Sequence, residues 1–128
     1  MDLFDTPRTL VPLPIDDADL ALLAQLPLSI PNGAVFARLR DETPWRAESV
    51  VVYGKRHLQP RLSAWYGDAA YTYSGLRLEP LPWSALLREI RAAVEAACGE
   101  RFNSVLLNRY RDGRDSMGMH SDDEPELG

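Results

Sequence analysis

The chain is poor in the residues that stabilise secreted and membrane proteins. It has one cysteine, so an intramolecular disulfide is excluded and a reducing cytoplasm is the expected compartment. No apolar run approaches the ~20 residues that a transmembrane helix requires, and the opening MDLFDTPR lacks the basic and then apolar pattern of a secretion signal. We therefore expect a cytoplasmic protein with no membrane contact, and we expect it to be a monomer.

Histidine is also scarce, with two residues in the chain, His57 and His120. A zinc hydrolase site needs a third nitrogen or sulfur ligand, and the remaining candidate, Cys98, lies at no recognisable ligand spacing from either histidine. A calcium-binding loop that starts at Asp112 is excluded because its third position is Arg114, where an oxygen ligand is required. The sequence therefore gives no support for a zinc hydrolase site or for a calcium-binding loop that starts at Asp112.

The remaining composition is that of an ordinary globular protein. The chain has 128 residues, of which 45% are hydrophobic and 26% are charged. This length suits one domain. Residues 1–15 hold three of the ten prolines and no sustained hydrophobic period, so we expect an extended N-terminal arm there and a single domain over residues 16–128.

The net charge of −5 is unevenly distributed along the chain. Residues 1–35 carry −4 and residues 112–128 carry −5, whereas residues 36–111 carry +4. Salt screens charges beyond roughly 10 Å, so a basic middle can face phosphates although the whole chain is acidic. A solvated surface of mixed charge explains the same pattern, and the charges alone do not separate the two interpretations.

Local patterns predict two helices and several strands. DDADLALLAQ indicates a short helix capped by an aspartate, and AVFARLR and ESVVVYG indicate strands. PWSALLREIRAAVEAA predicts an amphipathic helix with Pro82 in its first turn and Gly99 at its end. FNSVLLNRY predicts a strand in which alternation puts Asn108 and Tyr110 on one face.

The closing stretch contains His120 and Asp122, two residues apart. In an extended segment an imidazole and a carboxylate at this spacing point to the same side, and they form two-thirds of the facial triad of two histidines and one carboxylate that binds ferrous iron. Glycines in RDGRDSMG would let the backbone turn into such a site. Taken alone, such a triplet is more commonly explained by a surface histidine in an acidic loop.

Three stretches in order, YGKRHLQPR, WYGDAAYTYSG and FNSVLLNRYRDGRDSMGMHSDDEPELG, give the chain a resemblance to a known family. From about residue 50 to its end, the chain resembles the AlkB family of iron(II)- and 2-oxoglutarate-dependent nucleic-acid dealkylases. The resemblance implies an α+β, mainly β fold, a double-stranded β-helix (jelly roll) with flanking helices. It implies Fe(II) as cofactor, with 2-oxoglutarate and O2 as co-substrates, in DNA repair.

The resemblance also implies the reaction and the residues that take part. Family members hydroxylate the alkyl carbon on bases such as 1-methyladenine and 3-methylcytosine in alkylated DNA or RNA, and the product releases formaldehyde. His120 and Asp122 match the iron ligands, and Asn108 and Tyr110 match positions that bind 2-oxoglutarate. The positions that match substrate contacts are Tyr71, Tyr73, Ser74, Asp123, Glu124 and Arg61. A base must leave the duplex to be reached, which fits aromatic side chains beside carboxylates.

The family pattern continues beyond Gly128, with a second iron-binding histidine and arginines that pair with 2-oxoglutarate. We therefore expect residues 16–128 to be the N-terminal part of one AlkB-like domain, inactive without the rest. Two alternatives stay open, a non-catalytic nucleic-acid-binding module and an AlkB-like oxygenase that acts on protein or lipid. Preference for DNA or RNA, or for single or double strands, is not readable, and no wedge to fill the gap of an extruded base is identifiable in residues 30–50.

Overall fold

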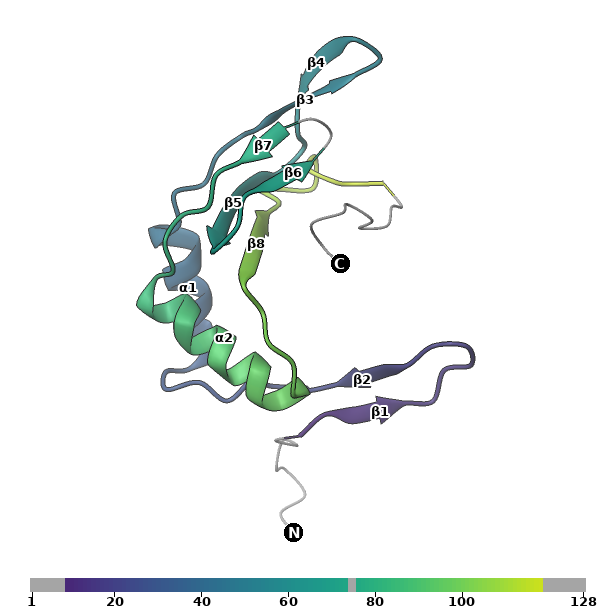
Figure 1. Cartoon of the computed structure of the whole chain (residues 1–128), viewed down its shortest axis with the longest axis vertical. Helices are drawn as coiled ribbons and strands as arrows, with labels where there is room; N and C mark the ends of the chain where they lie inside the picture. The colour runs from purple at the N-terminus through teal and green to yellow at the C-terminus, as the bar shows by residue number, and fades with distance from the viewer. Residues whose placement is uncertain (1–8, 74–75, 119–128) are drawn as a thin grey trace. The chain divides into compact units, whose positions relative to one another are not determined.

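The computed structural model describes residues 9–73 and 76–118, whose secondary structure is labelled in Figure 1. These ranges hold the helices α1 (Asn32–Glu42) and α2 (Ala85–Cys98). Their strands are β1 (Val11–Leu13), β2 (Leu20–Leu22), β3 (Ser49–Val52), β4 (Lys55–Leu58), β5 (Leu62–Gly67), β6 (Tyr71–Tyr73), β7 (Leu76–Leu78) and β8 (Ser104–Arg109). The chain is therefore of mixed α and β structure with strands in the majority, in line with the predicted class. No helix of the described part is long and apolar enough to cross a membrane.

The chain divides into two compact units. The first comprises residues 1–37 and 84–102, and the second comprises residues 38–83 and 103–128. The predicted boundary between an arm and a single domain stays a prediction, although strand pairing already begins at Val11, within the segment expected to be an arm.

In the first unit, β1 and β2 form an antiparallel hairpin in which Val11 pairs with Leu22 and Leu13 with Leu20. Asp17 lies between the strands at a φ of 59°, a left-handed conformation that aspartate tolerates. The helix predicted over DDADLALLAQ is therefore wrong. Its apolar stretch is too short for periodicity to separate helix from strand, and pairing with β1 decides the outcome.

The local signals predicted α2 well. The Ser84 hydroxyl caps the helix by accepting a hydrogen bond from the Leu87 backbone N–H at 3.1 Å. Gly99 ends it at a φ of 75°, with its own N–H donating to the Glu95 carbonyl at 2.8 Å. Pro82 precedes the helix instead of occupying its first turn. The helix and its glycine end are confirmed.

The strand predicted over AVFARLR is wrong, because α1 covers it. The first turn starts at Pro31, whose carbonyl accepts hydrogen bonds from the N–H groups of Ala34 and Val35. Val35 is the buried residue of α1, and Arg38 and Glu42 form an ion pair one turn apart at 3.4 Å on its exposed side. The stretch alternates over too few residues for a period of two to indicate a strand reliably.

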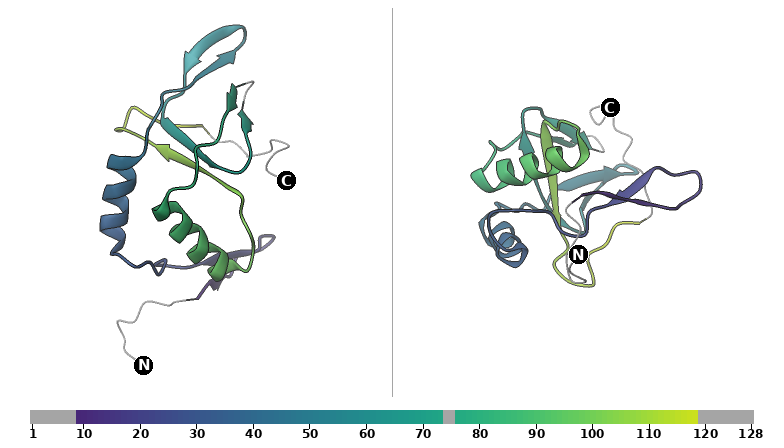
Figure 2. Two further views of the ribbon diagram at one scale, coloured as in Figure 1. Left: turned by 60° about the vertical axis from the view of Figure 1, so that its left-hand side comes forward. Right: turned by 90° about the horizontal axis from the view of Figure 1, so that it is seen from below.

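The second unit is organised around β5. All six residues of β5 pair antiparallel with β8, from Leu62 opposite Arg109 to Gly67 opposite Ser104 (Figure 2). The hairpins β3–β4 and β6–β7 belong to the same unit. The strands predicted over ESVVVYG and FNSVLLNRY are thereby confirmed as β3 and β8.

The second edge of β5 is also occupied. Ser63 exchanges two backbone hydrogen bonds with Arg46, and the Trp65 carbonyl accepts one from the Leu81 N–H at 2.8 Å. A strand with neighbours on both edges is shielded along its length, and residues 63 to 66 are accordingly only 4% to 8% exposed. The best-buried part of the described second unit is therefore the strand that aligns β8.

Candidate functional site

The pairing of β5 with β8 brings three of the predicted site residues together. Arg61 directly precedes β5 and Tyr110 directly follows β8, and the Arg61 guanidinium donates a hydrogen bond to the Tyr110 hydroxyl at 3.3 Å. Ser63 lies opposite Asn108 on the same strand pair. Asn108 is exposed and Tyr110 is 46% exposed, so both are open to a ligand.

Arg61 is unusual in this group because it is buried. Arg61 is only 8% exposed, and its Nε has no hydrogen-bond partner within the described part of the chain. A buried donor that finds no acceptor lowers stability by about 1–3 kcal/mol, so arginines in this state usually serve an acceptor that is supplied by a ligand or by another part of the protein. Arg61 is therefore a buried cation with an unpaired donor among the described residues, and its role as a substrate contact stays a prediction.

Tyr71 packs against an aromatic residue that the sequence analysis did not select. Its ring stacks on Trp65 with centroids 4.9 Å apart and planes at 30°, and Tyr71 is only 3% exposed. The Trp65 indole N–H donates to the Ala69 carbonyl at 2.6 Å. Trp65 pairs with Leu106 in β8, so the stack is joined to the strand that carries Asn108. The sequence signal for this stack was the presence of two aromatic residues six positions apart in WYGDAAY.

The other predicted residues are described in part or not at all. The backbone of Tyr73 pairs with Leu76 in the β6–β7 hairpin. The remaining predictions lie outside the described residues; they are Ser74, His120, Asp122, Asp123 and Glu124. Among the residues that are described, no group of three histidine, cysteine, aspartate or glutamate side chains could hold a metal ion. The roles of all these residues stay predictions.

The β3–β4 hairpin carries an aromatic residue that the sequence analysis also missed. Its two-residue turn is Tyr53–Gly54, with φ angles of 49° and 76°. Such turns favour asparagine followed by glycine. Tyr53 therefore has a left-handed backbone conformation, which raises the free energy of a residue with a Cβ by roughly 1–2 kcal/mol. Tyr53 is 101% exposed. The Tyr-Gly pair between two strand-like runs was the signal for this turn.

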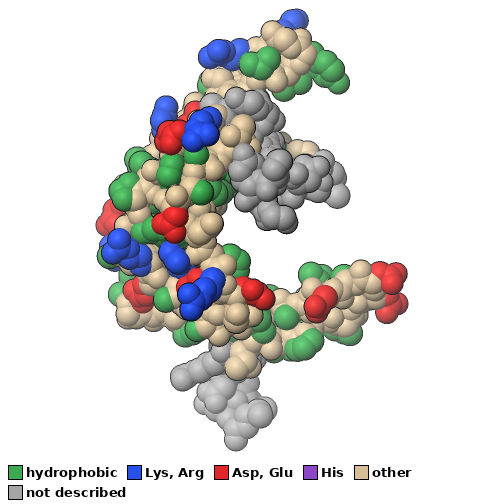
Figure 3. Space-filling view, viewed as in Figure 1, with side chains coloured by type: hydrophobic (Ala, Val, Ile, Leu, Met, Phe, Trp, Pro, Cys, Tyr) green, Lys and Arg blue, Asp and Glu red, His purple; other side chains and the backbone are tan. Residues whose placement is uncertain are grey.

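The surroundings of Tyr53 are apolar and basic. Val52, beside it, is 45% exposed, and Lys55 and Arg56 follow the turn, both exposed. Figure 3 shows basic and hydrophobic side chains gathered at the end of this hairpin. His57 is an exposed residue of β4 paired with Val50. The hairpin thus offers a ring and positive charge to solvent.

A cavity of about 280 Å³ lies at the second edge of β5, away from β8. Its lining includes Trp65 and two arginine–glutamate pairs, Arg46–Glu48 at 3.3 Å and Arg77–Glu79 at 2.6 Å. Among the predicted site residues that the structure describes, none lines it.

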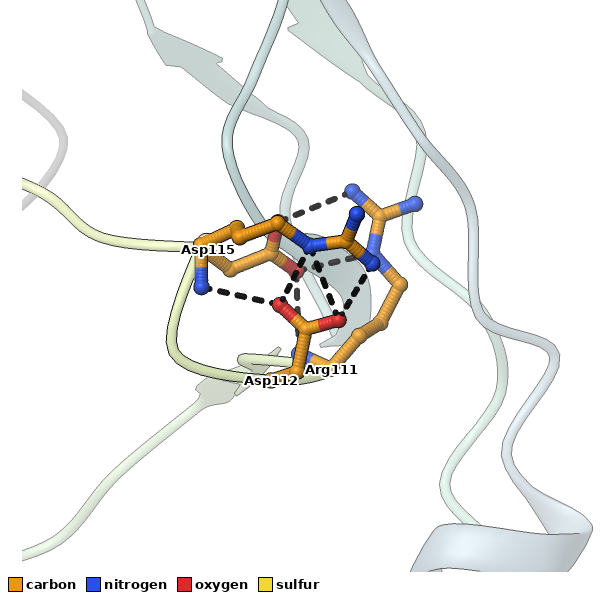
Figure 4. Close-up of polar contacts among 4 residues, drawn as sticks. Arg111, Asp112 and Asp115 are labelled. Atoms are coloured by element: carbon orange, nitrogen blue, oxygen red, sulfur yellow. Dashed lines mark hydrogen bonds and ion pairs between the residues drawn. The ribbon is translucent and has the colours of Figure 1, made fainter.

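A turn with two ion pairs follows Tyr110 (Figure 4). Arg111 pairs with Asp115 at 2.7 Å, and Arg114 pairs with Asp112 at 2.8 Å. Hydrogen bonds from the side chain and backbone of Arg111 lower the pKa of the Asp115 carboxyl, and those from Arg114 lower the pKa of Asp112. Both carboxylates are therefore held in their charged form.

Comparison with known proteins gives one family and a consistent set of relatives. The model of the 2OG-Fe(II) oxygenase superfamily matches residues 32–128. Human alpha-ketoglutarate-dependent dioxygenase alkB homolog 3 is 42% identical over 95 residues, which cover 73% of this chain and 33% of that protein. Human DNA oxidative demethylase ALKBH2 is 54% identical over 80 residues, 61% of this chain and 31% of that protein. The ALKBH2 protein of Arabidopsis thaliana is 36% identical over 99 residues, 73% of this chain and 32% of that protein. The chain spans about a third of the length of the curated relatives it matches.

Proposed function

The chain belongs to the AlkB family within the 2OG-Fe(II) oxygenase superfamily, and on that basis we propose that the full-length protein removes alkyl groups oxidatively from nucleic-acid bases. The proposed substrates are bases of the 1-methyladenine and 3-methylcytosine type, in DNA before RNA. The observation that carries the proposal is the pairing of β5 with β8, which sets Arg61 against Tyr110, two residues along the chain from Asn108. The cytoplasmic location and monomeric state expected from the sequence stay predictions.

We propose a double-stranded β-helix as the fold of the whole domain. The antiparallel β5–β8 pair, with further segments bonded to the second edge of β5, is the kind of strand arrangement from which such a fold is built. The family supports this assignment. The helices α1 and α2 would flank the strands.

The polar groups at the end of β8 suit a carboxylate ligand. Asn108 and Tyr110 are exposed donors, and the Tyr110 hydroxyl is held by the Arg61 guanidinium. Asn108 and Tyr110 would hold 2-oxoglutarate, and His120 and Asp122 would hold Fe(II). When bound, Fe(II) and 2-oxoglutarate would supply the chemistry for oxidising the alkyl carbon with O2. The chain's own contribution would be to orient the carboxylates of the co-substrate.

Selection of the damaged base would come from charge and stacking. Methylation of adenine N1 or cytosine N3 makes the base cationic, so the carboxylates of Asp123 and Glu124 would favour it over the unmodified base. Tyr71, which is only 3% exposed, would support the wall of the base site with its ring stacked on Trp65. Tyr73 and Ser74, which follow in the same stretch, complete the proposed base site.

The β3–β4 hairpin would bind the nucleic acid outside the base site. Exposed aromatic rings stack on bases, while Lys55 and Arg56 can neutralise phosphates. Tyr53 holds a strained backbone conformation without any packing that would compensate for it in the described residues, as its full exposure shows. Strain of this kind clusters at functional positions, which supports a role of Tyr53 in binding.

Substituting Tyr53 with asparagine tests this role without weakening the hairpin. Asparagine suits the left-handed turn, so the free energy of unfolding should not fall, whereas loss of the ring should raise the Kd for an oligonucleotide about 10-fold. The Tyr53→Phe variant keeps the ring and is expected to bind within about two-fold of the parent. Fluorescence anisotropy with a labelled strand measures both. Equal affinity of Tyr53→Asn and Tyr53→Phe would contradict the proposal.

The activity itself is tested on the full-length protein with an oligonucleotide that contains 3-methylcytosine. We expect formaldehyde and succinate in equal amounts, dependent on O2 and Fe(II), and none of this formaldehyde from the unmethylated strand. A methylated peptide in place of the oligonucleotide tests the alternative of a protein oxygenase. Oligonucleotide binding that does not depend on iron, with no product, would favour the alternative of a binding module. The exposed basic hairpin is compatible with that alternative.

A further inference from the structure

The turn that follows β8 is closed by its own side chains. The Asp115 N–H donates to the Asp112 carbonyl at 3.1 Å, and the Asp112 carboxylate accepts from the Arg114 N–H at 2.8 Å. The Asp115 carboxylate accepts from the Arg111 N–H at 2.9 Å. These three hydrogen bonds fix the backbone of five consecutive residues, immediately after the end of the strand pair (Figure 4).

The two acidic residues of the turn are not equivalent. The side chain of Asp115 is 10% exposed and receives three bonds from Arg111, from the backbone N–H, Nε and a terminal nitrogen, at 2.7 to 3.1 Å. The side chain of Asp112 accepts four bonds from Arg114 at 2.8 to 3.3 Å, but it is 48% exposed and the Arg114 side chain is 90% exposed. Exposed ion pairs contribute little, whereas shielded, charge-assisted hydrogen bonds fix geometry. Asp115 is therefore the better shielded of the two carboxylates that close the turn.

The turn directly follows a residue of the candidate site, so fixing its backbone can affect that site. Tyr110, one residue before it, is tied to Arg61, and His120 follows Asp115 by five residues. A segment that is ordered before its ligand binds loses less conformational entropy on binding, and affinity rises accordingly.

We propose that Asp115 is a positioning residue for the cofactor site. By closing the turn on Arg111 it fixes the backbone that directly follows Tyr110, a residue that the proposed function assigns to 2-oxoglutarate. Asp115 itself touches neither the metal nor 2-oxoglutarate in this role. The inference rests on the proposed function, because it assigns to Asp115 the pre-ordering of that same site.

The test compares Asp115→Asn with Asp112→Asn in the full-length protein. Both variants remove one negative charge from the same turn, and they differ in the burial of the carboxylate. Titration of 2-oxoglutarate into the Fe(II)-loaded protein without O2, followed by the visible charge-transfer absorption, gives the affinity. We expect the Kd to rise about 10-fold in Asp115→Asn, in the range of residues that orient ligands without being ligands, and less than two-fold in Asp112→Asn. In turnover, KM for 2-oxoglutarate should rise in Asp115→Asn while kcat at saturation changes less than two-fold.

Hydrogen–deuterium exchange on the metal-free protein gives an independent measurement. The Arg111 amide should exchange at least about 10-fold faster in Asp115→Asn, because its acceptor is weakened, and the rest of β8 should be unchanged. An unchanged Kd in Asp115→Asn, an equal change in both variants, or loss of the folded state in Asp115→Asn would each overturn the positioning role. Absence of the charge-transfer absorption in the unsubstituted protein would instead contradict the proposed function.

Discussion

Replacing His120 with alanine in the full-length protein is expected to lower the rate of demethylation by at least about 100-fold. Outer groups that only orient a metal ligand already contribute 10- to 100-fold, so removal of a ligand should have a larger effect. Asp122→Ala should do the same, because two donors remain where three are needed to hold Fe(II) with open positions. Formaldehyde release from an oligonucleotide with 3-methylcytosine, measured at saturating Fe(II), gives the rate.

The matched control is Ser121→Ala, which changes the residue between the two predicted ligands and removes neither of them. Its rate should stay within about two-fold of the parent. Bound iron, determined after gel filtration, should fall in His120→Ala and Asp122→Ala and be retained in Ser121→Ala. A His120→Ala protein that keeps its iron and its activity would show that the metal is bound elsewhere.

Elements with strong local signals were predictable from the sequence. The helix α2 has an amphipathic period, a serine cap and a glycine end within 16 residues, from Ser84 to Gly99, and local chemistry is enough to define it. The strand β8 has a clear apolar run between polar ends. The segments of β2 and α1 lack such signals. Each is a short apolar stretch compatible with both periods, and only pairing with β1 or packing of Val35 decides.

The residues of the candidate site could be proposed from the sequence and stay predictions, whereas the contacts among the described ones could not be proposed. Alternation along β8 relates Asn108 to Tyr110, since both belong to one segment. The partner of Tyr110 depends on the register between β5 and β8, which sequence patterns do not give, and so the contact with Arg61 was not foreseen. The Trp65–Tyr71 stack depends in the same way on how the chain turns between β5 and β6.

The register between β5 and β8 leaves no room for a side chain at Gly67. Substituting Gly67 with alanine is expected to lower the free energy of unfolding by about 3 kcal/mol. Gly67 ends β5 at a φ of 143°, where residues with a Cβ are strained. A Cβ there would lie 2.5 Å from the Asn103 carbonyl oxygen and 2.5 Å from the Ser104 Cα. Both are backbone atoms of the paired segment, so relief requires that β8 move away from β5.

The same added methyl group can be placed where it meets nothing. Gly33 lies in α1, and a Cβ added to it would have no heavy atom within 4 Å. Alanine also favours helices, so Gly33→Ala should raise the free energy of unfolding by about 0.5–1 kcal/mol. Urea unfolding of the two variants and the parent, followed by circular dichroism, gives the three free energies.

Because Gly67 ends the strand that aligns Arg61 with Tyr110, Gly67→Ala should also weaken 2-oxoglutarate binding, whereas Gly33→Ala should leave it unchanged. A Gly67→Ala protein as stable as the parent would mean that β5 and β8 are not held in the register described.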